Sequence, residues 1–291
     1  MSTKASKYNL IAFLLLLAAR NERKKNAKSA FDSRSYRARY WRSVQQRRDA
    51  YERKFRIQIR ATLNKIYKDL AGRIDVTNYR NEELVNIISQ EPIEKMLIEL
   101  YKVVGSDFAR EQVKQIKASH EGLETKSEAD WEAYLEDYVK TKAGLRITSI
   151  TGETRRQLLK ILRDVLEESI AEGLGADETA RLLQKEVIRR GIEINRWRSL
   201  RIARTEIMTA SNQGAYVGAE SMNLPMQKFW VATYDSRTRD THKIIEPQNP
   251  KEMTEKFSVG AYMMDYPGDP AGGPEEIINC RCAIAFRVKK F

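Results

Sequence analysis

The segment TRRQLLKILRDVL, residues 154–166, opens the part of the sequence that decides the fold. Thr154 and Gln157 have the spacing of a capping box, in which two side chains bond the free N–H groups at the start of a helix. Leucine, isoleucine and valine then recur every three or four residues as far as Ile170. This pattern predicts an amphipathic helix that ends at the glycines of residues 173–175.

Two more helices are predicted directly downstream. Asp177 is placed to cap a helix whose apolar stripe is formed by Leu182, Leu183, Val187 and Ile188. Gly191 is expected to end this helix, and a third helix is expected from about Arg196 to Gly218. Residues 145–222 therefore form a helical array built from local contacts.

The character of the sequence changes after Pro225. Residues 228–234 are aromatic and β-branched and predict a strand, and a polar helical turn follows with Arg237, Arg239 and His242. After a loop rich in Pro and Gly, residues 277–288 are typical of a terminal strand. The last part, residues 226–291, is therefore predicted to be a small α+β unit.

The upstream sequence is mainly helical. Long helical patterns cover residues 31–75 and 82–118, the second interrupted by Pro92 and Gly105, and a shorter one covers residues 131–142. The predicted fold class is α+β, with predominantly helical N-terminal and middle regions and the small C-terminal unit. The predicted divisions are a basic arm with the start of a long helix (1–60), a helical region (61–144) and a C-terminal domain (145–291).

Charge is concentrated in the first of these divisions. Residues 1–60 contain 17 Lys and Arg against four Asp and Glu, a net charge of +13, whereas the whole chain carries +12. A basic helix face is either a solvated surface or a surface laid along DNA or an acidic protein. The candidates for contact with DNA or an acidic protein are Arg34, Arg37, Arg39, Arg42, Arg47, Arg48, Arg53 and Lys54.

An apolar run, Leu10–Ala19, precedes this basic helix and resembles the core of a signal peptide. Arg20, Arg23 and Lys24 follow it at once, which is unfavourable for export. A short helix buried against a partner or core is the favoured interpretation, and a membrane contact is the alternative. The run is shorter than the roughly 18 residues that a membrane span needs.

The candidate metal ligands are His242, Cys280 and Cys282. In a strand, residues two apart face the same side, so the two thiols would share one face, and a histidine brought in by folding would supply a third zinc ligand. Asp235, Asp240 or water could complete the site. The alternative is that the thiols are small buried apolar groups and the histidine is structural. A Cys/His hydrolytic dyad is a third possibility, but no residue is assigned a catalytic role.

A group of charged side chains surrounds these candidates. We expect a structural ion network formed by Arg204, Glu206, Asp235, Arg237 and Arg239. Arg204 and Glu206 point in directions about 200° apart on a helix, so one of them is expected to bond the segment of residues 235–242.

Several classes of protein are excluded. Two cysteines cannot form a disulfide framework, and such a chain suits a reducing compartment. The glycine-rich segment of residues 266–274 carries prolines that remove the backbone donors of a phosphate-binding loop.

Four motifs in order resemble one known family. They are Ile202-Ala-Arg-Thr-Glu206, Trp230 with Tyr234-Asp-Ser-Arg-Thr-Arg-Asp-Thr-His242, Pro267-Gly-Asp-Pro270, and Asn279-Cys-Arg-Cys282. Together with the helical lead-in, this region of about residues 145–288 resembles the phage Mu F-like family of minor head (head morphogenesis) proteins.

The resemblance implies a structural virion protein of a tailed phage or prophage, not an enzyme. It would act at the portal vertex or capsid interior in head assembly and in DNA packaging or ejection. Its expected partners are the portal protein, the major capsid protein and viral DNA without sequence preference, and assembly would take place in the host cytoplasm. Two alternatives stay open: a zinc- or Cys-dependent hydrolase in the C-terminal unit, and a membrane-active protein of genome delivery.

Overall fold

The computed structural model describes residues 33–118, 128–142, 144–233 and 235–289. The apolar run Leu10–Ala19 and Tyr234 of the second motif lie outside these residues. Contacts divide the chain into two units, with the boundary between Arg42 and Ser43. The helix of residues 34–71 begins in the smaller unit and continues into the larger one.

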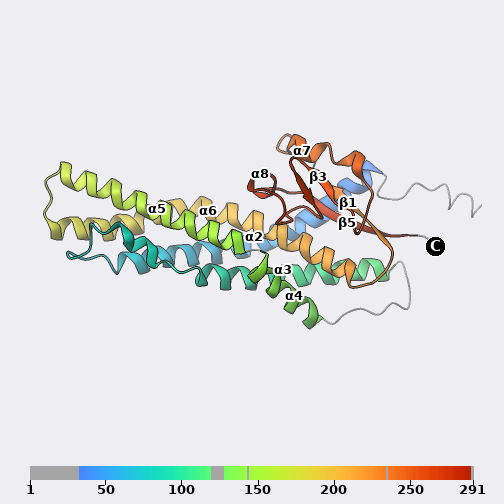
Figure 1. Cartoon of the computed structure of the whole chain (residues 1–291), viewed down its shortest axis with the longest axis horizontal. Coiled ribbons are helices and arrows are strands. Elements are labelled where there is room, and N and C mark those ends of the chain that lie inside the picture. The colour runs from blue at the N-terminus through green and yellow to red at the C-terminus, as the bar shows by residue number, and fades with distance from the viewer. Residues whose placement is uncertain (1–32, 119–127, 143, 234, 290–291) are drawn as a thin grey trace, which may run out of the picture. The chain divides into compact units, whose positions relative to one another are not determined.

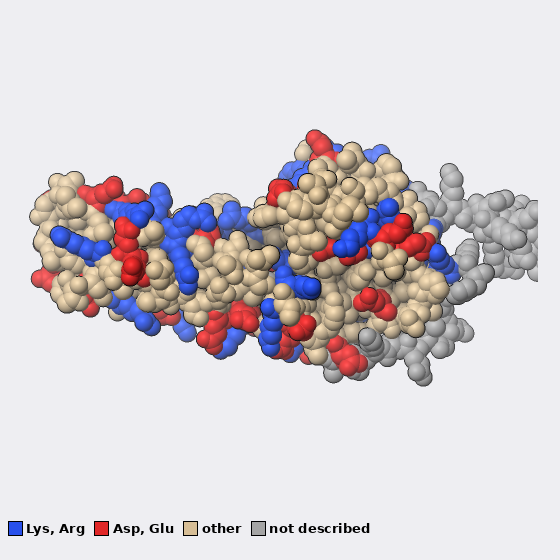
Figure 2. Space-filling model, viewed as in Figure 1, with Lys and Arg blue, Asp and Glu red and all other residues tan. Residues whose placement is uncertain are grey.

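Long helices make up most of the described residues, as the helical periodicity predicts. Their bounds are α2 Arg34–Ala71, α3 Glu91–Lys117, α4 Glu128–Thr141, α5 Gly144–Ala171 and α6 Ala176–Glu220, with a 3-10 helix at Glu82–Ile87. From Ser43 onward these helices pack along one another, with α3 beside α6 and α5 beside α6 (Figure 1). Figure 2 shows acidic and basic side chains interspersed along the face of the helices that it displays.

The predicted start of α5 is wrong. The helix begins ten residues before Thr154, whose Oγ1 donates 2.8 Å to the carbonyl oxygen of Ile150 in the pattern of a threonine inside a helix. The buried Ile147 continues the apolar face upstream, so the capping spacing is accidental. The predicted end is confirmed: α5 stops at Ala171, and Gly173 has a φ of 67°.

The predicted break at Gly191 is also wrong, because α6 runs through it without interruption. A Cβ added at Gly191 would lie 2.1 Å from Cδ1 of Tyr67 in α2. The glycine therefore serves close packing between two helices and does not end one of them.

The same explanation holds for Gly105, which does not interrupt α3. A Cβ added at Gly214 of α6 would lie 2.0 Å from the carbonyl oxygen of Gly105, and one at Gly218 would lie 2.6 Å from that of Ala109. Small residues four apart on each helix thus let the α3 and α6 backbones come into contact. Pro92 stands in the first turn of α3, where a proline is favoured.

The C-terminal unit contains a three-stranded antiparallel sheet in the order β2-β1-β5 and a separate hairpin of β3 and β4. The strands are β1 Met226–Val231, β2 Lys251–Glu252, β3 Phe257–Val259, β4 Tyr262–Met264 and β5 Ala283–Val288. Two short helices, α7 Asp240–Lys243 and α8 Pro274–Ile277, connect them, with a 3-10 turn at Glu246–Gln248. The predicted α+β class is confirmed.

Two apolar cores hold the larger unit together. The first lies among the helices and includes Phe55, Leu100 and Leu158. The second joins the C-terminal unit to the helices, since Trp230 and Ile284 of the sheet share it with Met208 of α6. Among the helices of the described residues, none combines the length and apolar character that a membrane span requires.

We expect Gly214→Ala to destabilise the protein by at least the 1–3 kcal/mol typical of overpacking, because the new methyl group would meet backbone that cannot rotate away. The matched control is Gly152→Ala in α5, where nothing lies within 4 Å of the added Cβ. That change should stabilise by up to about 1 kcal/mol through helix propensity. Urea unfolding followed by circular dichroism measures both. Equal midpoints for the two variants would contradict the close helix contact.

Candidate metal centre

The three candidate ligands come from two segments of the C-terminal unit. His242 lies in α7, whereas Cys280 and Cys282 lie between α8 and β5. The prediction that both cysteines stand on a strand is wrong, because Pro274 opens a helical turn and Asn279 adopts a left-handed φ of 58°. The strand can begin only after this turn, at Ala283.

The three side chains nevertheless converge, as expected. Nδ1 of His242 lies 3.6 Å from Sγ of Cys280 and 3.4 Å from Sγ of Cys282. All three ligand atoms lie within 4.8 Å of one another. The residues are 2–3% exposed, and both thiols are free. The turn at Asn279, and not strand alternation, brings the two sulfurs to the same side.

Glu276 sets the orientation of the imidazole. Its Oε2 lies 2.9 Å from Nε2 of His242 and accepts a hydrogen bond of 2.8 Å from Oγ1 of Thr241. The ring edge also packs against Trp230, with centroids 5.4 Å apart. The carboxylate charge favours a proton on Nε2, although this contact is not an aligned hydrogen bond, and a neutral ring with that proton would present the Nδ1 lone pair to the sulfurs. Histidines that bind metals are oriented in this manner.

The thiols form one electrostatic unit. A hydrogen bond from Cys282, together with His242, lowers the pKa of the Cys280 thiol well below its ordinary range. The contact with Cys280 and burial raise the pKa of Cys282. The backbone N–H of Cys282 also points at Sγ of Cys280, 3.4 Å away. The pair thus releases one proton readily and keeps the other, which a metal would displace.

Arg48 of α2 holds the cysteine segment from the helical side. Its guanidinium donates to the carbonyl oxygens of Arg281 and Cys282 at 3.2 and 3.0 Å. It also donates 2.7 Å bonds to Ser211 and Asn212 of α6. Arg48 is 3% exposed, so its assignment to a DNA- or portal-binding surface is wrong.

The remaining basic candidates differ in exposure. Arg47 is half-buried and pairs with Asp107 and Glu111 of α3, so part of its charge is used within the fold. Arg53 and Lys54 are exposed on α2. Arg34, Arg37, Arg39 and Arg42 belong to the smaller unit, and Arg34, Arg39 and Arg42 are exposed there.

The expected single ion network is wrong. Arg237 does lie 3.9 Å from the Asp235 carboxylate, but Arg204 and Glu206 pair elsewhere. Arg204 pairs with Glu52 of α2 at 3.1 Å. Glu206 is buried, lies 3.5 Å from Arg146 of α5 and accepts a 2.9 Å hydrogen bond from Tyr101 of α3. Both charged side chains of this pair therefore bind partners on neighbouring helices and not in the C-terminal unit.

The segment around Asp235 is held by a different arginine. Asp235 pairs with Arg281 at 2.6 Å, and although partial burial acts to raise it, this contact and the backbone N–H of Arg237 lower the pKa of Asp235. Arg239 donates to the carbonyl oxygen of Ile278. The Asp240 carboxylate is 93% exposed beside Lys243. Neither aspartate belongs to the His–Cys cluster, so their expected role as a fourth ligand is wrong.

The sequence did not lead us to predict the contact of Glu276 with His242 or the burial of Arg48. Arg48 stands seven and eleven residues before Phe55 and Ile59, which is the spacing of one helix face, so the periodicity carried a signal of burial. Glu276 precedes Cys280 by four residues in a segment predicted as loop and strand, and nothing in its spacing marks it.

Two sulfurs and an imidazole nitrogen form a set of ligands that suits zinc, with one position left for water or another donor. The same atoms also suit a relay in which Glu276 orients His242 toward a thiol nucleophile. A substrate, however, would have to reach thiols that are 3% exposed or less. Burial favours a structural metal centre or a tightly packed core over catalysis.

The protein is thus a mainly helical protein with a small C-terminal α+β unit that contains a buried His–Cys cluster. Residues 160–285 match the family described as Phage Mu protein F like protein. For this region, the resemblance to the Mu F-like family of phage head morphogenesis proteins is therefore confirmed.

The chain is also similar to one enzyme. It is 28% identical over 143 residues to NAD(+)--arginine ADP-ribosyltransferase EFV of Enterococcus faecalis. The match covers 48% of this chain but 28% of that protein. No solved structure matches.

We expect the purified chain to bind one zinc or cobalt ion, with thiolate-to-cobalt charge-transfer absorption, and to melt at a lower temperature after chelation. Cys280→Ser should lose the absorption. Glu276→Gln should weaken metal binding roughly 10–100-fold, because the histidine loses its orienting carboxylate.

The matched control is Glu275→Gln, which changes the neighbouring exposed carboxylate that contacts Tyr262. Its metal affinity should equal that of the unmodified chain. Protein purified without chelator that contains no metal and binds none on titration would leave only the packed-core interpretation.

Proposed function

We propose that this protein is a minor structural component of a tailed-phage or prophage head, placed at the portal vertex or capsid interior. There it would act in head assembly and in DNA packaging or ejection. The observation that carries the proposal is the match of residues 160–285 to the Mu F-like family. The position in the head and the contact with DNA go beyond that match.

The placement of the metal centre supports a structural role. The cluster of His242, Cys280 and Cys282 lies where α7, the turn before β5 and the helix α2 meet, the last through Arg48. A bound zinc ion would fix the C-terminal unit in a single geometry, as structural zinc sites do in small folds. A subunit of an assembly benefits from such rigidity. Three protein ligands would leave a coordination position open, as in catalytic zinc sites, but the burial of both thiols closes this position to a substrate.

Three other functions have weaker support. A zinc- or Cys-dependent hydrolase would need access to buried thiols. ADP-ribosyl transfer is the activity that the name of the Enterococcus faecalis relative gives, but the match covers 28% of that protein. A membrane-active role would depend on Leu10–Ala19, and liposome flotation of the whole chain, with and without this segment, would test it.

The head proposal is tested by co-expression with the major capsid and portal proteins encoded in the same phage or prophage genome. We expect the chain to sediment with assembled heads and to be retained at salt concentrations that remove loosely bound protein. A chain found only in the soluble fraction, with heads of normal form in its absence, would contradict the proposal. An unrelated soluble protein expressed in its place serves as the control.

DNA contact is proposed for the exposed cations of the basic helix. Arg48 cannot contribute, and Arg47 already pairs with two carboxylates of α3. The exposed Arg39, Arg42, Arg53 and Lys54 remain, with the basic residues that precede them in the sequence. Such cations bind phosphates without regard to base sequence and release counterions, so binding weakens steeply with salt.

Reversal of Arg39, Arg42, Arg53 and Lys54 to Glu should lower duplex-DNA affinity equally for unrelated sequences. The slope of log affinity against log salt should become shallower by about 0.9 for each phosphate that the variant no longer neutralises. Lys65→Glu/Lys68→Glu, which changes exposed cations further along α2, is the control. Deletion of residues 1–60 is unsuitable, because Arg48, Phe55 and Ile59 belong to the fold. Unchanged affinity in the fourfold variant would place DNA binding elsewhere.

A further inference from the structure

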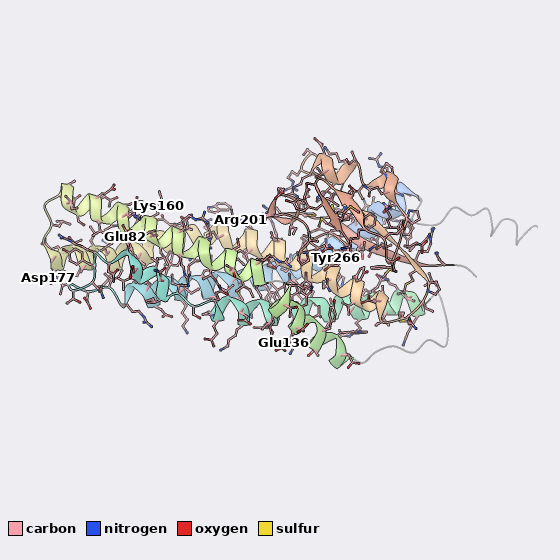
Figure 3. The ribbon with its side chains drawn as sticks, in the orientation of Figure 1. Glu82, Glu136, Lys160, Asp177, Arg201 and Tyr266 are labelled. Carbon is pink, nitrogen blue, oxygen red and sulfur yellow. The ribbon has the colours of Figure 1, made fainter. Side chains whose placement is uncertain are left out.

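A cleft separate from the His–Cys cluster opens between the helices and the C-terminal unit. It has a volume of about 400 Å³. The first turns of α5, the middle of α6 and the segment of residues 270–278 line it. Figure 3 labels Arg201, one of its lining residues, on the part of α6 that lies beside α8.

Much of the cleft is apolar. Ile202 and Ile277 form buried parts of the lining. Leu145 and Ile278, which also line it, are 81% and 40% exposed. Apolar side chains gathered in a concave surface, with polar groups around them, mark a binding site more often than scattered exposed residues do.

The lining also carries uncompensated positive charge. Arg146 faces Glu206, and Arg156 pairs with Glu153, so these four charges cancel. The other three cations, Lys142, Arg198 and Arg201, have no carboxylate within 4 Å among the described residues.

Arg198 is the most unusual of these three cations, because it is 6% exposed and its hydrogen-bond acceptors are neutral. They are the side chains of Asn195 and Thr154 and the carbonyl oxygen of Ile150. Burial lowers the pKa of Arg198, while Tyr67 and Glu153 act to raise it and the nearby Arg201 acts to lower it. A buried guanidinium beside a second one is stabilised by an incoming anion. The cleft thus suits a ligand that presents carboxylates next to an apolar side chain.

The turn between α5 and α6 presents that combination. Residues 167–178 contain five Asp and Glu and no Lys or Arg. Glu168 pairs with Arg190, and Glu178 accepts from the backbone of Gly175. The other three, Glu167, Glu172 and Asp177, are exposed, and among the described residues no cation lies within 4 Å of them. Ile170, between them, is 75% exposed.

One copy cannot place this acidic turn in its own cleft. Leu145 and Ile170 stand on the same helix, and 25 residues at 1.5 Å each separate them by roughly 38 Å. Figure 3 shows Asp177 at the end of the helices away from Arg201, and Figure 2 shows acidic side chains at that end. Contact between the two surfaces therefore requires two molecules.

We propose that the acidic turn of one copy, residues 167–178, docks in the cleft of a second copy, with Ile170 against Leu145 and Ile278. The contact joins different surfaces of the two copies, so it generates a ring or an open chain and not a closed two-fold dimer. The contact area is small and part of the attraction is electrostatic, so assembly is weak, concentration-dependent and sensitive to salt.

Charge exchange between the two surfaces tests the proposal on the whole chain. The turn variant is Glu167→Lys/Glu172→Lys/Asp177→Lys, and the cleft variant is Lys142→Glu/Arg201→Glu. Each variant alone brings like charges together and should sediment as a monomer at concentrations where the unmodified chain assembles. An equimolar mixture restores opposite charges at both kinds of contact, so it should assemble again. Lys65→Glu/Lys68→Glu should assemble like the unmodified chain.

Cross-linking provides a second measurement. Ile170→Cys in one preparation and Leu145→Cys in another should give a bismaleimide-linked dimer only when mixed, because the native thiols are buried. Circular dichroism must show that the variants fold. The proposal is overturned if the unmodified chain stays monomeric at all concentrations, if the mixture does not assemble, or if the cross-link does not form. It is also overturned if the charge reversals alter DNA binding and leave assembly unchanged.

Discussion

The buried guanidinium of Arg48 is the interaction on which the arrangement of the larger unit depends. It donates from α2 to Ser211 and Asn212 of α6 and to the carbonyl oxygens of Arg281 and Cys282. Asn212 donates in turn to the carbonyl oxygen of Cys282 and accepts from the backbone of Ile284. One charge and one amide thus join two helices to the segment that carries the thiols. Because a buried charge is tolerated only with its partners in place, these elements must fold together.

Close helix packing makes this network possible. Gly214 and Gly218 let α6 touch the backbone of α3, and Gly191 lets it receive the ring of Tyr67 from α2. Ser211 and Asn212 lie one turn before Gly214 on α6 and are buried. An apolar seam alone would hold the helices together but would leave their register free. Directed hydrogen bonds to Arg48 fix that register, and with it the position of the cysteine segment relative to α7.

The sequence predicted features that depend on local pattern, and it failed where distant contacts decide. Apolar periodicity located α2, α5 and α6, and aromatic, β-branched residues located β1. Gly191 and Gly105 were predicted to break helices, because glycine weakens a helix. Here the absence of a side chain at each position lets a neighbouring element pack closely against the helix. The prediction that Cys280 and Cys282 converge with His242 is confirmed, but its reason is wrong. The turn at Asn279, and not the alternation of side chains along a strand, places both sulfurs on the same side. Glu276 has no signal in the sequence, because its role exists only after α8 and α7 meet.

The basic helix shows why composition alone could not assign function to each residue. Residues 47–54 contain four cations within about two turns, yet they face different surroundings. Arg48 donates hydrogen bonds to the cysteine segment, and Arg47 pairs with two carboxylates of α3, whereas Arg53 and Lys54 face solvent. A helix with positive charge on every side can therefore contribute to the fold on one face and leave charge for a polyanion on another. Because Arg48 is fixed by the cysteine segment, the orientation of the outward face is fixed as well. The geometry of the candidate metal centre and the presentation of the basic surface are thus linked through one helix.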